Sequence, residues 1–103
     1  MTEVVQASSA WLDQMRILDY FAEAQAESVA IRFSQAIDET IALIAEFPDM
    51  GNPWESSNPR LAGVRYRLVE GFRNHLVVYR QFDRHLVVLR IFHVSQNIDE
   101  HLK

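Results

Sequence analysis

The 103-residue sequence contains no cysteine, which excludes a disulfide framework and a thiolate-bound metal site. Proline and glycine are also scarce, with three of each, and most of them gather between residues 48 and 63, where they predict a loop. No apolar run approaches the roughly 18 residues that a membrane span requires. Apolar residues make up 49% of the chain, which is too much for a disordered protein. We therefore expect one soluble, cytoplasmic domain over residues 1–103, with no membrane contact and no cofactor.

The net charge is only −4, but the two parts of the chain differ in sign. Residues 1–59 contain two basic and ten acidic side chains, a net charge of −8. Residues 60–103 contain eight basic and four acidic side chains, a net charge of +4, together with all four histidines. This split indicates a cationic functional surface on an acidic scaffold, unless the charges are simply scattered over two solvated faces.

Two helical stretches follow a short predicted strand at residues 3–7. Apolar residues recur every three or four positions over residues 11–22 and again over residues 30–47. One unbroken helix over both stretches would be unusually long for a small domain, so we expect a hairpin of two packed helices. The expected N-cap residues are Ser8 or Ser9 for the first helix and Ser28 for the second.

After the loop that begins at Pro48, the apolar period changes from 3.6 to 2. Runs over residues 64–68, 76–80 and 86–92 predict three strands, and the short connection between the last two predicts an antiparallel hairpin. The order β-α-α-β-β-β implies an α+β domain in which a helical hairpin covers one face of an antiparallel sheet. The other face would stay partly open to a partner. Residues 98–103 are expected to form a last helical turn or a loose tail.

Arginines on the predicted strands are candidates for a binding site, because their planar guanidinium donates bidentate hydrogen bonds to phosphates and carboxylates. Strand alternation puts Arg65 and Arg67 on one face of their strand. The opposite face carries Val64, Tyr66 and Leu68, which we expect to pack against the helices. The two guanidiniums should then face the uncovered side of the sheet.

Three further arginines, Arg73, Arg80 and Arg90, are candidates for the same surface. If the hairpin turn is at Asp83-Arg84, Arg80 pairs with Val87 and Arg90 lies on the other face, although a shift of one residue changes this. The alternative interpretation is that all these arginines are ordinary polar residues of a half-exposed sheet.

The remaining candidates have alternative structural roles. His93 closes the last strand, where it acts either as a general acid or base or, more commonly, as a hydrogen-bonded structural residue. Trp54 either contacts a partner or pins the loop to the body. Carboxylates on the first helix are expected to be solvated, and the other histidines lack metal-ligand spacing. These carboxylates are Asp13, Asp19 and Glu23, and these histidines are His75, His85 and His101.

Six short segments follow one another in an order that is characteristic of a known family. They are Trp11-Leu12-Asp13 with Ile17 and Tyr20, Ala30 with Phe33 and Ala36-Ile37, residues 44–51, residues 61–65, residues 74–80 and residues 88–93. In this order and spacing they resemble the ParE side of the RelE/ParE superfamily of bacterial toxins from toxin–antitoxin pairs. The resemblance covers nearly the whole chain and implies the β-α-α-β-β-β fold.

The resemblance also implies function. It implies a partner antitoxin whose C-terminal segment wraps the toxin and neutralises it, so that a toxin–antitoxin hetero-oligomer can form. For the ParE branch it implies growth inhibition and plasmid stabilisation through inhibition of DNA gyrase, which traps cleaved DNA. For the RelE branch it implies ribosome-dependent cleavage of mRNA.

Departures from the family pattern favour the ParE branch. Arg65 and Arg67 fall where the nuclease branch places lysines, but Leu76 and Gln96 fall where it places arginines. A leucine cannot stabilise the anionic transition state of phosphodiester cleavage. We therefore expect a non-enzymatic gyrase inhibitor without catalytic residues. The alternatives are a RelE-like nuclease and an antitoxin-binding domain whose toxicity is reduced or lost.

Overall fold

The computed structural model describes residues 3–96 and residue 102. The observed helices and strands follow the expected order, with one short additional strand, β2, inside the predicted loop. They are β1 (Glu3–Gln6), α1 (Ser8–Ala24), α2 (Glu27–Glu46), β2 (Asn52–Pro53), β3 (Val64–Val69), β4 (Phe72–Gln81) and β5 (His85–His93). The same loop holds two short 3-10 turns, Pro48–Met50 and Pro59–Leu61. The predicted tail over residues 98–103 lies outside the described residues, except for Leu102.

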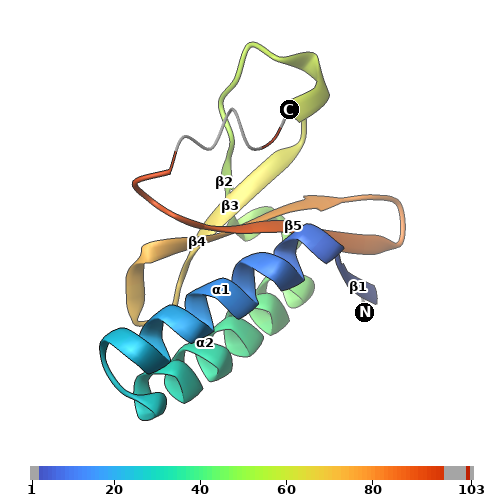
Figure 1. Ribbon diagram of the computed structural model, residues 1–103. Helices are drawn as coiled ribbons and strands as arrows, with labels where there is room; N and C mark the ends of the chain where they lie inside the picture. Colours follow the sequence, from blue (N-terminus) through green and yellow to red (C-terminus); the bar gives the residue numbers. More distant parts are fainter. Residues whose placement is uncertain (1–2, 97–101, 103) are drawn as a thin grey trace.

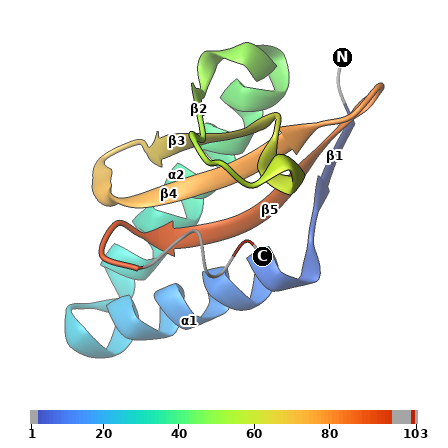
Figure 2. The ribbon, with the colours of Figure 1, turned by 90° about the horizontal axis from the view of Figure 1, so that it is seen from above.

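The five strands form one sheet in the order β1-β5-β4-β3-β2. The sheet is mixed, not wholly antiparallel as expected, because β1 pairs with β5 in parallel. Figure 1 shows both helices on one side of the sheet and the segment between β2 and β3 on the other. The parallel pairing ends at Gln6 opposite Val88, so the second half of β5 pairs with β4 but has no strand neighbour on the β1 side. Helix α1 runs along this part of β5 (Figure 2).

The helical hairpin is confirmed, and only Gln25 and Ala26 separate its two helices. The backbone N–H groups of both residues donate to the carbonyl of Phe21, which ends α1. The predicted serine caps are wrong, because Ala7 and Ala26 occupy the N-cap positions and neither helix has a side-chain cap. Among the described residues, neither helix combines the length and the apolarity that crossing a membrane requires.

Each face of the sheet has its own apolar core. The core on the helix side joins the two helices to the inner faces of β3, β4 and β5, and its largest fully buried side chains are Tyr79, Phe33 and Ile37. The core on the opposite side consists of Leu61, Val64, Leu76, Val78 and Phe92, with Trp54 and Tyr66 packed against it. This second core replaces the open face that we expected, because the loop after α2 folds back over the sheet.

Tyr79 and Gly51 tie this loop to the sheet on the helix side. The fully buried Tyr79 donates its hydroxyl proton to the carbonyl of Pro48 over 2.7 Å and accepts the N–H of Gly51 over 2.9 Å. Burial raises the pKa of this phenol above its ordinary value. The hydroxyl therefore stays protonated and keeps both hydrogen bonds, which fix where the chain leaves α2.

Candidate functional site

The expected orientation of Arg65 and Arg67 is wrong. In the antiparallel ladder, Arg65 lies opposite Tyr79 and Arg67 opposite Val77, and both partners belong to the core on the helix side. Directly opposed residues of an antiparallel pair point to the same face, so both arginines lie on the helix side. The apolar face of β3 instead meets the folded-back loop. Arginine and apolar residues therefore exchange the faces that we had assigned to them.

In this position both arginines make local structural contacts. Arg65 donates Nη1 to the carbonyl of Gly51 over 2.8 Å and to that of Asp49 over 3.3 Å, which holds the first 3-10 turn. Arg67 makes a 3.4 Å ion pair with Glu70 across the β3–β4 turn, and its Nε is buried without a hydrogen-bond partner. Neither guanidinium is presented on the face that was expected to bind a partner.

Arg80 and Arg90 lie on the same face of the sheet, a point that the sequence left open because it depends on the strand register. The predicted pairing of Arg80 with Val87 is confirmed. Between Val78 and Tyr79, however, the β4–β5 register shifts by a β-bulge, so that Arg90 lies opposite Val78. A β-bulge inserts one extra residue into one strand. Each later residue of that strand then points to the face opposite to the one that unbroken alternation predicts. Both arginines therefore lie on the sheet face that carries Val64 and Val78, and from there the Arg90 guanidinium reaches Asp13 of α1.

Asp13 is buried, which corrects the expectation of a solvated carboxylate. Its Oδ2 accepts Nε of Arg90 over 2.7 Å, and its Oδ1 accepts Nη2 over 2.9 Å. Oδ2 also accepts the backbone N–H of Ile91 over 2.9 Å, at the part of β5 that has no strand neighbour on that side. The hydrogen bonds to Asp13 raise the pKa of the Arg90 guanidinium. The carboxylate therefore joins α1 to the open edge of β5.

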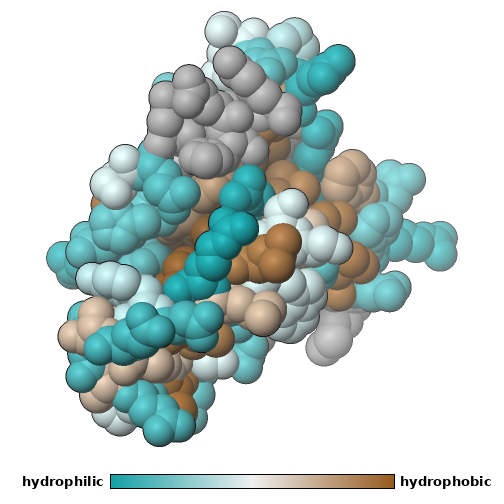
Figure 3. All heavy atoms as spheres, in the orientation of Figure 1, coloured by the Kyte–Doolittle hydropathy of each residue, from teal (hydrophilic) through white to brown (hydrophobic). Residues whose placement is uncertain are grey.

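Three arginines from separate segments meet in one cleft, which we call the three-arginine cleft. Arg60 comes from the loop, Arg80 from β4 and Arg90 from β5, and they line a cavity of about 330 Å³. Arg80 donates Nη1 to the carbonyl of Arg60 over 3.3 Å. Sequence reasoning missed Arg60, because only the loop's path over the sheet brings it to the two strands. Apolar side chains gather over the middle of the molecule above α1, between hydrophilic side chains (Figure 3).

Two other candidates lie apart from this cleft. Trp54 is half-buried and packs edge-to-face on Tyr66, with 5.6 Å between ring centroids. It therefore pins the loop to the sheet, which was one of its two expected roles. Arg73 is exposed and lines a separate hollow with Arg67 beside the β3–β4 turn. The structure does not bring it to Arg80 or Arg90.

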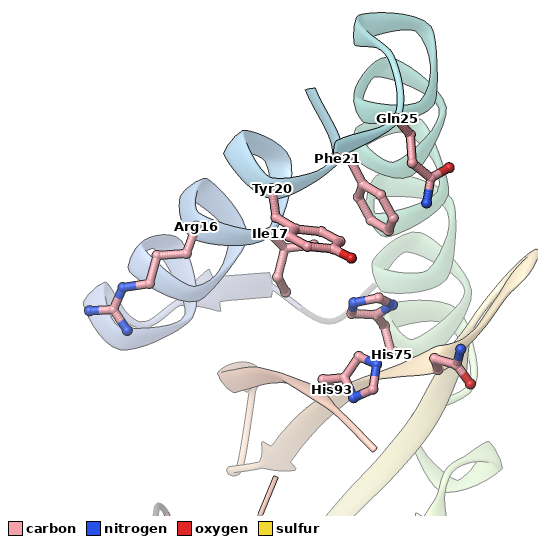
Figure 4. Close-up of a pocket in the computed structure, with 8 residues that line it drawn as sticks. Arg16, Ile17, Tyr20, Phe21, Gln25, His75 and His93 are labelled. Carbon is pink, nitrogen blue, oxygen red and sulfur yellow. The ribbon is translucent and has the colours of Figure 1, made fainter. Parts of the chain in front are cut away.

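His93 lines a second cavity, of about 370 Å³, between α1 and the ends of β4 and β5. Figure 4 shows His93 and His75 below the aromatic rings of Tyr20 and Phe21, while Arg16 points away from the histidines. Ser95 donates its backbone N–H to Nδ1 of His93 over 3.1 Å, and the Ser95 hydroxyl lies 2.7 Å from the same nitrogen. Its hydrogen bonds fit the structural role. Among the described residues, no three histidine or acidic side chains are placed to hold a metal ion.

His75 is the unexpected residue of this cavity. It is only 7% exposed, its Nδ1 has no hydrogen-bond partner, and its ring lies edge-to-face against Phe33 and His93. Burial, with a smaller contribution from the positive charge of His93, lowers the pKa of His75 from 6.5 to about 4. His75 is therefore neutral near pH 7. Its position in the sequence, between the polar Asn74 and the apolar Leu76, gave no signal for this environment.

Acidification is expected to destabilise the fold through His75. Its folded-state pKa lies below its unfolded value, so between pH 6.5 and about pH 4 the unfolded chain binds a proton that the folded chain does not. The free energy of unfolding should fall by about 3 kcal/mol over this window. Urea unfolding of the wild type and of His75→Phe at several pH values measures this contribution, and the variant should lose it. The neighbouring, exposed Asn74→Ser variant should keep the wild-type dependence, and an unchanged dependence in His75→Phe would contradict this assignment.

The comparison with known families decides the identity of the fold. The family model of the ParE toxin of the type II toxin–antitoxin system parDE matches residues 4–98. The chain belongs to the ParE toxin family. Within this ParE-family domain, the match includes every described helix and strand except the first residue of β1.

Solved structures support the same fold. The chromosomal ParDE toxin–antitoxin system from P. aeruginosa contains a chain with 22% sequence identity and a TM-score of 0.74, and the alignment covers 90% of this chain and 96% of that one. A YoeB/ParE toxin from Agrobacterium tumefaciens has 20% identity and a TM-score of 0.56, with coverage of 89% and 98%. A search among curated proteins finds no significant match. Membership of the ParE family implies an antitoxin partner for this toxin.

Proposed function

We propose that this ParE-family toxin inhibits DNA gyrase by binding it, and that a cognate antitoxin neutralises the toxin. The observation that carries the proposal is that apolar residues fill the middle of the sheet face opposite the helices, with Arg80 and Arg90 beside them. Leu61, Val64, Leu76, Val78 and Phe92 form a closed core on that face. A binding mechanism needs no reactive groups there, whereas a nuclease does.

Phosphodiester cleavage requires cationic donors around the phosphate, where negative charge develops in the transition state. Arg65 and Arg67 lie on the helix side and contact the protein's own backbone or Glu70. Leu76 is buried, and Gln96 uses its side-chain oxygen to accept the backbone N–H of His93 over 2.8 Å. These contacts favour inhibition by binding over ribosome-dependent cleavage of mRNA.

The outer face of α1 offers a surface for the antitoxin. Trp11, Leu12 and Met15 are each more than half exposed, although they are large and apolar. Adjacent exposed apolar side chains of this size are typical of an interaction surface. An amphipathic helix of the antitoxin would bury them through residues at helical spacing.

Purified toxin should inhibit gyrase at micromolar concentration. Titration into supercoiling and DNA-cleavage assays should show loss of supercoiling together with accumulation of cleaved DNA, while relaxation by a type I topoisomerase serves as the control and should not change. Unchanged supercoiling and cleavage would contradict the proposal. Primer extension after induction would reveal codon-positioned mRNA cleavage if the chain were a nuclease. Normal growth on induction without the antitoxin would indicate that toxicity has been lost.

A further inference from the structure

The three-arginine cleft carries positive charge that the described part of the chain neutralises only at Arg90. Arg90 is paired with Asp13, but within the described residues no carboxylate pairs with Arg60 or Arg80. Among the described residues, those that line the cleft include no aspartate or glutamate. Arg80 is held over the ring of Phe82 at 5.4 Å and donates one hydrogen bond, to the carbonyl of Arg60. Its guanidinium has further N–H groups to offer a ligand.

The first turn of α1 adds to this positive potential. Ala7 and Ser9 line the cleft, the N-cap residue Ala7 supplies no side-chain acceptor, and the first turn contains no acidic residue. The unpaired N–H groups at a helix N-terminus carry a partial positive charge. Helix and arginines together therefore favour an anion at one place.

The walls of the cleft are apolar. Leu61, Val64, Leu89 and Leu102 line it beside the arginines. A small inorganic anion would leave these walls in contact with water, whereas a ligand with an apolar group next to its anionic group would bury both kinds of surface. The cavity of about 330 Å³ suits one or two side chains.

We propose that the three-arginine cleft binds a short acidic peptide segment of a protein partner, in which a carboxylate side chain adjoins a leucine-like side chain. Arg60 and Arg80 pair with the carboxylate, and the leucines of the cleft receive the apolar side chain. A nucleic acid fits less well, because its binding relies on an extended basic stripe and this chain has a net charge of −4 and a pI near 5.5. The site does not depend on gyrase being the target of the toxin.

Binding of a defined probe tests the proposal on the full chain. The probe is the acetylated and amidated pentapeptide Leu-Glu-Leu-Glu-Leu, titrated into ¹⁵N-labelled protein and followed by amide chemical shifts. Shifts should concentrate at Leu61, Arg80 and Leu89. The counterpart with glutamine in place of glutamate should bind about tenfold more weakly, which corresponds to the loss of one charge-assisted contact. Raising the ionic strength from about 50 mM to about 300 mM should weaken the binding of the acidic probe, because salt screens its charges.

Substitutions in the cleft should weaken the binding of the same probe. Arg60→Gln and Arg80→Gln are each expected to reduce its affinity by about five- to tenfold. Arg60 is exposed, and its side chain makes no hydrogen bond or ion pair within the described part of the chain, so its replacement should leave the fold intact. Arg84→Gln is the matched control, because it removes the same charge from the exposed β4–β5 turn, outside the cleft, and should bind like the wild type.

Four outcomes would overturn the proposal. The first is equal binding of the glutamine counterpart, and the second is no loss of affinity in both cleft variants. The third is that inorganic phosphate produces the same shifts and binds at least as tightly as the peptide, which would make the cleft a simple anion site. The fourth is a short DNA duplex that binds the cleft more tightly than the peptide. Inhibition of gyrase is measured separately, so its failure would leave each of these results interpretable.

Discussion

Replacement of Asp13 by alanine is expected to lower the free energy of unfolding by about 3–5 kcal/mol, the range observed when one partner of a buried ion pair is removed. The Asp13 side chain is 7% exposed and that of Arg90 is 19% exposed. The variant would leave a largely desolvated guanidinium without the anion that holds it at 2.7 and 2.9 Å. A small domain has a total stability of only about 5–15 kcal/mol, so much of it would be lost.

The backbone amide of Ile91 adds to this cost. Its N–H donates to Oδ2 of Asp13 over 2.9 Å, and Ile91 is 1% exposed. A buried donor left without an acceptor costs about 1–3 kcal/mol. Because β1 ends opposite Val88, none of the described strands is placed to accept this N–H in the variant. Asp13 thus supplies the hydrogen-bond acceptor for β5 that a further residue of β1 would otherwise supply.

Urea unfolding of three variants separates these contributions. Asp19→Ala removes an exposed carboxylate from the same helix and should change stability by less than about 0.5 kcal/mol. Asp13→Ala combined with Arg90→Met removes both charges. It should therefore regain the part of the loss that comes from a guanidinium deprived of its carboxylate, and keep the part that comes from the Ile91 amide. A loss below about 1 kcal/mol in Asp13→Ala would mean that water replaces the carboxylate at this edge.

The sequence predicted the elements of the fold because their signals are local. The period of 3.6 before residue 48 and of 2 after residue 63 placed both helices and the three long strands. The faces of the strands were harder to predict, because they depend on what packs against each face. We assigned the apolar face of β3 to the helices, yet Val64 and Tyr66 pack under the loop that contains Trp54. Alternation identifies two faces but does not say which is covered by what.

The candidate site was predicted only in part, for a related reason. The orientation of Arg90 depends on a single inserted residue in the β4–β5 ladder, which no sequence pattern marked. The position of Arg60 depends on the path of a loop. The ion pair of Asp13 joins residues 77 positions apart, and periodicity alone describes Asp13 as one more polar residue of a helix. Long-range contacts of this kind decide the chemistry of the cleft.

The structure divides the basic residues of the second part of the chain between separate places. Of the seven arginines after residue 59, three line one cleft, while Arg65 and Arg67 lie on the helix side of the sheet. The positive net charge of that part of the chain therefore does not form a continuous basic surface. It supports recognition of a compact acidic group better than recognition of a nucleic acid backbone.

Gly51→Ala is the second variant for which we expect a large loss, of about 3–5 kcal/mol from overpacking and two weakened hydrogen bonds. The backbone of Gly51, with φ −71° and ψ 156°, is open to any residue, so conformational strain is not the cause. The cause is steric, because an added Cβ would lie 2.8 Å from two ring carbons of Tyr79 and closer still to its hydroxyl. Tyr79 is fully buried and cannot move aside without giving up its bonds to Pro48 and Gly51.

A double-mutant cycle with Tyr79→Leu tests this cause by thermal and urea unfolding. Tyr79→Leu should itself be destabilising, because it removes a buried ring and both hydroxyl bonds. In that background, however, the added methyl group of Gly51→Ala meets no ring, so its further cost should fall below about 1 kcal/mol. Ser57→Ala, an exposed substitution in the same loop, is the control and should have little effect. If Gly51→Ala costs as much beside leucine as beside tyrosine, the close approach to the ring is not what requires glycine there.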